Sequence, residues 1–115
     1  MISVFIEKNR NGYAGFTCKG HAGYAEHGND IVCSAVSMLV INTINSLEKL
    51  TDCKFNCDSK MDGYVKVTFL EELSESARVL VDSMILGISS VEKQYGKGYV
   101  KLTTKEVFND DEFEP

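Results

Sequence analysis

Apolar and polar residues alternate at the start of the chain. Ile2, Val4 and Ile6 are separated by single residues, which is the period of a half-buried β-strand. The turn sequence Asn-Arg-Asn-Gly follows at residues 9–12, and its Asn-Gly pair tolerates the positive φ angles of a tight hairpin. Residues 13–19 then predict a returning strand, so the chain begins with a predicted β-hairpin.

Two long segments carry apolar residues at spacings of three and four, which is typical of amphipathic helices. The first helix is expected from about Ile31 to Leu50, and the second from near Ser74 to about Tyr95. Gly87 lies within the second helix, where it costs about 1 kcal/mol relative to alanine and permits close contact with another helix. The apolar faces consist of Val36, Leu39, Val40, Ile44, Leu47 and Leu50 in the first helix, and Ala77, Leu80, Val81, Met84, Ile85, Ile88, Val91 and Tyr95 in the second.

Two apolar residues of the first helix, Met38 and Ile41, fall outside its main apolar face. A second face of this helix is therefore expected to be covered, either by the rest of the fold or by another subunit. Of these two interpretations, we favour burial against another subunit.

Alternation also predicts three further strands. Residues 54–59 and 64–70 form a second hairpin, and residues 99–107 form the last strand. The resulting order, ββαββαβ, favours an α+β fold, an antiparallel or mixed sheet of about five strands with two long helices packed on one face. We expect a single α+β domain over residues 1–108 and an acidic, disordered tail over residues 109–115.

The composition is typical of one small domain outside the membrane. The chain has 115 residues, 43% of them hydrophobic, which is enough for one core and too few for two ordinary domains. Its start lacks the basic residues of a signal peptide. The longest apolar run, 35–41, is interrupted by Ser37 and is far shorter than the roughly 18 residues of a membrane span. We therefore expect a cytoplasmic protein with no membrane partner.

The net charge and the cysteine spacing limit the functions that the chain can have. The formal net charge of −5 argues against a direct nucleic-acid partner, which would need clustered Lys and Arg. An acidic surface instead suits a basic partner. The four cysteines contain no C-x-x-C pair, so we expect reduced thiols at Cys18, Cys33, Cys53 and Cys57.

One stretch, from Gly20 to Ser37, holds the candidate chemistry. It contains both histidines, one cysteine and a glycine-rich segment that ends where the first helix is expected to begin. If Asp30 is the N-cap of that helix, its side chain accepts a hydrogen bond from the backbone N–H of Cys33, which then lies in the first turn. Unpaired N–H groups and the helix dipole stabilise negative charge there, so this position favours the nucleophilic thiolate.

A base for this thiol comes from the preceding strand. A fold that brings the end of that strand to the start of the helix would pair His21 with Cys33. His27 is a second candidate base, but it lies within the expected loop 22–29, where no regular element holds it. Asp30 has two compatible roles, capping the helix and orienting an imidazole. The alternative for Cys33 is a free cysteine that packs as a small hydrophobic residue.

A metal site is a second possibility for the same stretch. Zinc accepts histidine, cysteine and aspartate, and the candidate ligands are His21, His27, Cys33 and Asp30. Their spacing differs from the short paired spacings of structural zinc sites. We therefore expect no metal and no cofactor.

Backbone and loop groups around the thiol have expected roles as well. The N–H groups around Cys33 and Ser34 are candidates to stabilise a tetrahedral oxyanion. Ser37 lies four residues after Cys33, so the two residues share one helix face. The loop 22–29 contains two glycines, and we expect it to order over an extended peptide.

The same residues resemble a known signature. The bacterial family of ribosomal-processing cysteine proteases called Prp has a signature similar to Gly20-His21-Ala22-Gly23 followed by Gly28-Asn29-Asp30-Ile31-Val32-Cys33-Ser34-Ala35-Val36-Ser37. The resemblance covers nearly the whole chain, because the size, the element order and the acidic tail also fit.

This resemblance implies a cysteine endopeptidase that removes the N-terminal extension of a basic substrate, large-subunit ribosomal protein twenty-seven, during ribosome assembly. It implies Cys33 as the nucleophile, His21 as the proton carrier, and a homodimer. A non-catalytic binding module for ribosome assembly is the alternative function. The supporting or substrate-binding positions that we expect are Gly20, Ala22, Gly23, Asp30, Ser34 and Ser37.

Overall fold

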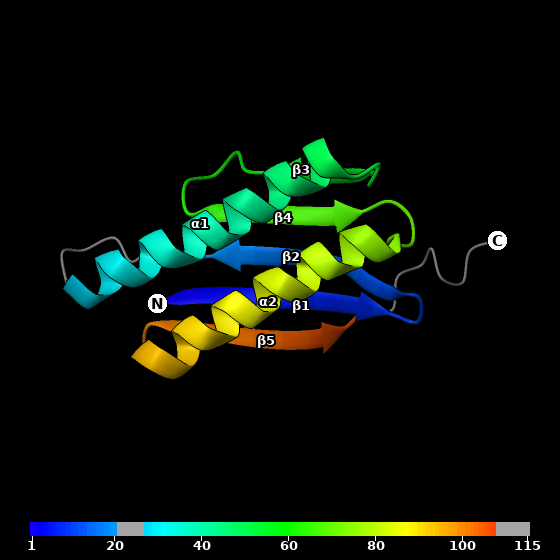
Figure 1. Cartoon of the computed structure of the whole chain (residues 1–115). Helices are drawn as coiled ribbons and strands as arrows, with labels where there is room; N and C mark the ends of the chain where they lie inside the picture. Colours follow the sequence, from blue (N-terminus) through cyan, green and yellow to red (C-terminus); the bar gives the residue numbers. More distant parts are fainter. Residues whose placement is uncertain (21–26, 108–115) are drawn as a thin grey trace.

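The computed structural model describes residues 1–20 and 27–107, which form a five-stranded sheet with two helices on one of its faces (Figure 1). The predicted α+β class and the order ββαββαβ are confirmed, and the predicted tail 109–115 lies outside the described residues. The elements are β1 (Ile2–Asn9), β2 (Gly12–Lys19), α1 (His27–Leu50), β3 (Phe55–Asp58), β4 (Tyr64–Phe69), α2 (Glu75–Tyr95) and β5 (Val100–Glu106).

The sheet has the strand order β3-β4-β2-β1-β5. β1 pairs with β2 and β4 pairs with both β2 and β3 in antiparallel fashion, whereas β1 and β5 are parallel. The sheet is therefore mixed, and both predicted hairpins are present. Gly12 has a φ of 115°, as expected for the glycine of the first turn.

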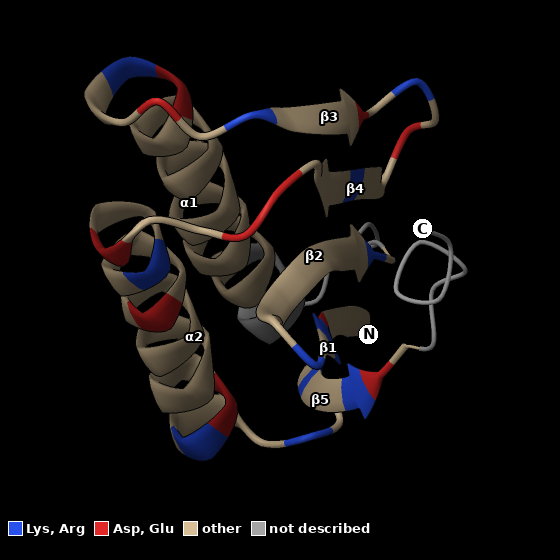
Figure 2. Ribbon diagram, turned by 90° about the vertical axis from the view of Figure 1, so that its right-hand side faces the viewer, with Lys and Arg blue, Asp and Glu red and all other residues tan. Residues whose placement is uncertain are grey.

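The core lies between the sheet and the helices. Ile6 is opposite Phe16 and Phe16 is opposite Val67, so these three buried side chains point to the same face. Figure 2 shows both helices on one side of the sheet, and no described element covers the other side. The buried apolar residues are Ile2, Val4, Ile6, Phe16, Val32, Val36, Val40, Leu47, Val67, Phe69, Ala77, Val81, Met84, Ile88 and Val100.

The second helix begins and contacts its neighbour as its sequence predicts. Ser74 is the N-cap of α2, and its side chain accepts a hydrogen bond from the backbone N–H of Ala77 at 3.2 Å. Gly96 ends the helix with a φ of 100°. A Cβ at Gly87 would lie only 2.9 Å from Cδ2 of Leu39 on α1, which confirms the expected close approach of the two helices.

The start of the first helix differs from the prediction. α1 begins at His27 and not near Ile31, so Asp30 is the fourth helical residue and cannot be the N-cap. By helix propensity alone, Gly28 favours a loop. Glycine costs a helix about 1 kcal/mol relative to alanine, which is small beside the free energy that a long helix gains from tertiary packing. An acidic residue in the first turn is also favoured by the helix dipole.

The outer side of α1 carries exposed apolar residues. Met38 is 67% exposed and Ile41 is 53% exposed, so the described fold does not cover them. Leu50, the last residue of α1, is also exposed, and its predicted place in the apolar face is wrong. By length and composition residues 31–50 could cross a membrane, although core helices of soluble proteins have the same character.

The substitution Gly15→Ala tests the close packing of the central strands. A Cβ at this position would lie 2.2 Å from the backbone oxygen of Val67, which cannot move without disturbing the β2–β4 pairing. We expect a loss of about 1–3 kcal/mol in the free energy of unfolding, measured by urea denaturation.

Gly98→Ala is the matched control for this substitution. No atom lies within 4 Å of a Cβ placed there, so its free energy of unfolding should stay within about 0.5 kcal/mol of the starting protein. Equal stability of the two variants would contradict the close approach of β2 and β4.

Candidate active site

A pocket of about 340 Å³ lies where β2 ends, beside α1 and the connection from β3 to β4. In Figure 1 the end of β2, the beginning of β1 and the N-terminal half of α1 lie at the same end of the molecule. The sequence segments that meet here are far apart along the chain, and the pocket therefore depends on the tertiary fold. The described residues that line it are Ile2, Cys18, Gly20, Cys33, Val36, Ser37, Ser59, Met61, Asp62, Gly63, Tyr64 and Val65.

The thiol of Cys33 opens into this pocket from α1. Cys33 is half-buried, and its Sγ lies 4.0 Å from the Oγ of Ser37, one helical turn further on. Either atom can donate in this contact, so the hydroxyl can stabilise a thiolate by donating to it. The predicted shared face of Cys33 and Ser37 is confirmed, and both side chains line the pocket.

The helix start changes the expected surroundings of the thiol. Cys33 is the seventh residue of α1, so it lies in the second turn and not in the first. Only the first four N–H groups of a helix lack partners inside it, and in α1 these belong to residues 27–30. The N–H groups of Cys33 and Ser34 come after these four, and their expected role in stabilising an oxyanion stays a prediction.

Gly20 fixes the path of the chain beside the thiol. Its N–H donates a hydrogen bond to the carbonyl oxygen of Gly63 at 2.9 Å, which extends the pairing of β2 with β4 to the pocket. Its φ is 114°, and a Cβ would lie 2.3 Å from the carbonyl oxygen of Met1. Only glycine fits this position. The next residue in the chain is His21, so the candidate base is attached directly to a lining residue of the Cys33 pocket.

The structure describes only some of the other predicted site residues. His21, Ala22 and Gly23 lie outside the described residues, and their assignments stay predictions. Ser34 is exposed and is absent from the described lining of the pocket. The alternative base His27, expected within a loop, is the first residue of α1.

The metal hypothesis gains no support from the described part of the chain. Within it, no group of three or more His, Cys, Asp and Glu side chains could hold a metal ion. His21, one of the four candidate ligands, is not among these residues.

A second thiol in the pocket was not identified from the sequence. Cys18 lies on β2 in the row that contains Val4 and Val65, and burial together with the nearby Cys33 raises its pKa to about 11. Burial also raises the pKa of Cys53 and of Cys57, the former helped by Glu71 and the latter by Asp58. Strand alternation places Cys18 on the helix side, but only the packing of α1 brings it to the pocket.

The connection between β3 and β4 was also missed as part of the site. The sequence identified residues 60–63 as a turn, and Gly63 has the φ of 72° that such a turn needs. Met61 is 69% exposed at the pocket, and Asp62 and Tyr64 lie beside it. These residues line the same pocket as Cys33 because β4 pairs with β2, a long-range contact that the local turn sequence does not reveal.

Comparison with known proteins places this arrangement in a family. A family model for the cysteine protease Prp matches residues 1–101. The chain is 33% identical over 110 residues to the ribosomal processing cysteine protease Prp of Bacillus subtilis strain 168, covering 90% of this chain and 97% of that protein. It is 26% identical over 108 residues to the protein of the same name from Staphylococcus aureus strain Mu50, covering 91% and 100%.

Solved structures share the fold. The crystal structure of the ribosomal processing protease Prp from S. aureus in complex with a substrate peptide superimposes with a TM-score of 0.83 at 23% identity, covering 91% of this chain and 100% of that one. The structure of SMU.848 from Streptococcus mutans has a TM-score of 0.79 at 28% identity, covering 93% and 96%.

The fold, the thiol in its pocket and the family match define a cysteine protease, a hydrolase. The chain belongs to the Prp family, which confirms the resemblance seen in its sequence. The alternative of a non-catalytic binding module receives no support from these comparisons.

The raised pKa of Cys18 predicts a distinctive alkylation profile. Iodoacetamide reacts with the thiolate, so in a Cys33→Ser variant, where burial still raises the pKa of Cys18, the rate at Cys18 should keep rising with pH beyond the midpoint of the unfolded chain. After unfolding in urea, the same cysteine should titrate near the ordinary value of about 8.5. Mass spectrometry of the Cys18 peptide gives both profiles. The same midpoint in the folded and the unfolded chain would contradict the burial of this thiol.

Proposed function

We propose that this protease removes the N-terminal extension of large-subunit ribosomal protein twenty-seven during ribosome assembly. In this proposal Cys33 is the nucleophile and His21 is the proton carrier. One observation carries the assignment: the half-buried Cys33 shares its pocket with Gly20, to which His21 is directly bonded. Consecutive Cα atoms are about 3.8 Å apart, so His21 follows a lining residue of this pocket at that distance along the chain.

The reaction is an acyl transfer in two halves. His21 takes the proton of the Cys33 thiol, and the thiolate attacks the carbonyl carbon of the scissile bond to form a tetrahedral oxyanion. The C–N bond then breaks, the amine leaves with the proton that His21 returns, and an acyl thioester stays on Cys33. A water molecule, deprotonated by His21, attacks the thioester and releases the carboxylate product and the free thiol.

Ser37 has a supporting role in this mechanism. Its hydroxyl lies 4.0 Å from the Cys33 Sγ and can donate a hydrogen bond to the thiolate before attack. Asp30 stays a candidate to orient His21, now from the first turn of α1. Gly20, Ala22 and Gly23 would give the substrate backbone close access on the side of His21.

The substrate class is supported by the pocket and by the charge of the chain. The pocket is formed by an apolar floor, which includes Ile2 and Val36, and by the exposed connection from β3 to β4, so an extended peptide has access to the thiol. The net charge of −5 suits a basic ribosomal protein. The relatives from B. subtilis and S. aureus are named ribosomal processing proteases, which agrees with this substrate.

We also propose that the protease is a cytoplasmic homodimer. The exposed apolar residues Met38 and Ile41 on the outer side of α1 support a contact between two copies, because burying them would remove apolar surface from water. The relatives are named ribosomal processing proteases, and bacterial ribosomes are in the cytoplasm, which supports this location.

Cleavage of the extended ribosomal protein tests the catalytic assignment. Cys33→Ser and His21→Ala should each lower kcat/KM by about 10³-fold or more, because each removes one partner of the proton-transfer pair. Intact mass of the product measures cleavage, and a thermal melt shows whether each variant is folded. Cys57→Ser, which alters an exposed cysteine of β3, should retain full activity. A folded Cys33→Ser variant that still cleaves would overturn the proposal.

The dimer is tested by the paired substitutions Met38→Lys and Ile41→Lys. Two buried ammonium groups oppose association, so the double variant should run as a monomer in analytical ultracentrifugation at concentrations where the starting protein is a dimer. Leu70→Lys, which changes an exposed apolar residue after β4, is the control and should leave the mass unchanged. A dimer that persists in the double variant excludes this face of α1 as the interface.

A further inference from the structure

The face of the sheet opposite the helices, called here the open face, is rich in lysine. Directly opposed residues of neighbouring strands point to the same side, so the strand registers define three rows across β4, β2, β1 and β5. The rows are Tyr64-Lys19-Ser3-Lys101, Lys66-Thr17-Phe5-Thr103 and Thr68-Gly15-Glu7-Lys105. Four lysines therefore share one side of the sheet in a chain whose net charge is −5.

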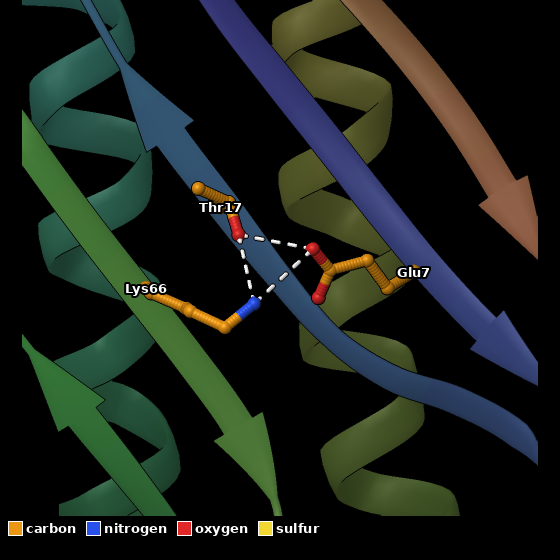
Figure 3. Close-up of polar contacts among 3 residues, drawn as sticks. All are labelled: Glu7, Thr17 and Lys66. Carbon is orange, nitrogen blue, oxygen red and sulfur yellow. Dashed lines mark hydrogen bonds and ion pairs between the residues drawn. The ribbon is translucent and has the colours of Figure 1, made fainter. Parts of the chain in front are cut away.

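One of these lysines is already neutralised. The Nζ of Lys66 lies 3.4 Å from the Oε2 of Glu7, and the hydroxyl of Thr17 donates to the same oxygen at 3.0 Å (Figure 3). Asp58 on β3 is opposite Lys66 and adds a second carboxylate beside it. Among the described strand residues of the open face, Glu7 and Asp58 lie beside Lys66, and Lys19, Lys101 and Lys105 form the rest of its cationic part.

Two of the remaining lysines lie over an aromatic ring. The Nζ of Lys19 lies 5.3 Å from the ring centroid of Phe5, and the Nζ of Lys105 lies 4.7 Å from it. Lys19, Lys101 and Lys105 are all exposed, and Figure 2 shows the basic segments of β5 on the strand at the sheet edge. The open face thus offers exposed positive charge around an aromatic centre.

The chain leaves the described part of the fold at this face. Val107 follows β5, and its N–H donates to the carbonyl oxygen of Lys8 at 2.8 Å. Val107 also lines a hollow of about 330 Å³, together with Glu7, Ala14, Lys66, Thr68 and Lys105. The last eight residues of the sequence, 108–115, therefore start beside the lysines of the open face.

The composition of this terminal segment complements the open face. Residues 108–115 read Phe-Asn-Asp-Asp-Glu-Phe-Glu-Pro, with four carboxylate side chains and two aromatic rings. Eight extended residues reach about 26–29 Å. The four strands span about 15 Å from β5 to β4, so the segment can reach every lysine of the open face.

We propose that the acidic segment 109–115 docks on the open face and neutralises Lys19, Lys101 and Lys105. It is covalently attached at the edge of the face, so its effective concentration there is in the millimolar range. A polyanion such as RNA or a second copy of this chain must approach against the net negative charge of the whole protein. Docking of this segment would neutralise the three lysines toward other anionic partners.

Lysine acylation tests this docking on the full chain. Acetylation by an N-hydroxysuccinimide ester is followed by mass spectrometry in the starting protein and in the variant Asp110→Asn, Asp111→Asn, Glu112→Gln and Glu114→Gln. Neutralising the segment should raise the acetylation rates of Lys19, Lys101 and Lys105 by about threefold at low salt, because ion pairing withholds the amine. Lys49 and Lys93, near the ends of α1 and α2, should not change.

The controls separate docking from general electrostatics and from other occupants. The double variant Asp110→Asn with Asp111→Asn is measured beside Glu71→Gln with Glu72→Gln, which removes two charges after the end of β4. Only the first of these two variants should raise the acetylation rates of the three lysines. In 1 M salt, where the Debye length is about 3 Å, the difference between starting protein and variant should disappear.

Three results would overturn the docking proposal. The first is acetylation of the three lysines at equal rates with and without the acidic groups at low salt. The second is protection that is lost on tenfold dilution, which identifies a second copy as the occupant. The third is an equal affinity of the starting protein and the neutralised variant for a single-stranded oligonucleotide, which means that the face is open to RNA in both.

Discussion

The pairing of β2 with β4 is the constraint on which the site depends. β2 is joined in sequence to β1, but its other edge pairs with a strand that follows α1 and β3. The hydrogen bond from Gly20 to Gly63 continues this pairing to the end of the sheet. As a result, the turn before β4 faces the end of β2, and the packing of α1 across both strands adds Cys33 to the same pocket.

Local sequence was sufficient to predict most of the fold. The hairpins and α2 follow from alternation, turn residues and the Ser74 cap, which act between residues close in the chain. The start of α1 could not be predicted in this way, because residues such as Gly28 disfavour a helix by an amount that tertiary packing readily outweighs. Because α1 begins at His27, Asp30 lies in the first turn of the helix and is not its N-cap, and Cys33 lies in the second turn.

The candidate site was predictable only in part, and for the same physical reason. The spacing of His21 and Cys33 matched a family signature, and Gly20 and Cys33 do share a pocket. Cys18 and Met61 join this pocket through strand pairing and helix packing over long sequence separations, which no local pattern encodes. In the second turn of α1, the thiol depends less on the helix dipole, whose effect fades beyond the first turn, and more on side-chain neighbours such as Ser37.

The close approach of Gly20 to the carbonyl of Met1 affects where an affinity tag can be attached. Ile2 lines the pocket and the backbone of Met1 lies against Gly20, so the first residues border the cavity that holds Cys33. An affinity tag fused ahead of Met1 would be attached one residue from the lining of that cavity. A tag at this end would compete with a peptide for the space beside the thiol, so the opposite end of the chain is the better place for one.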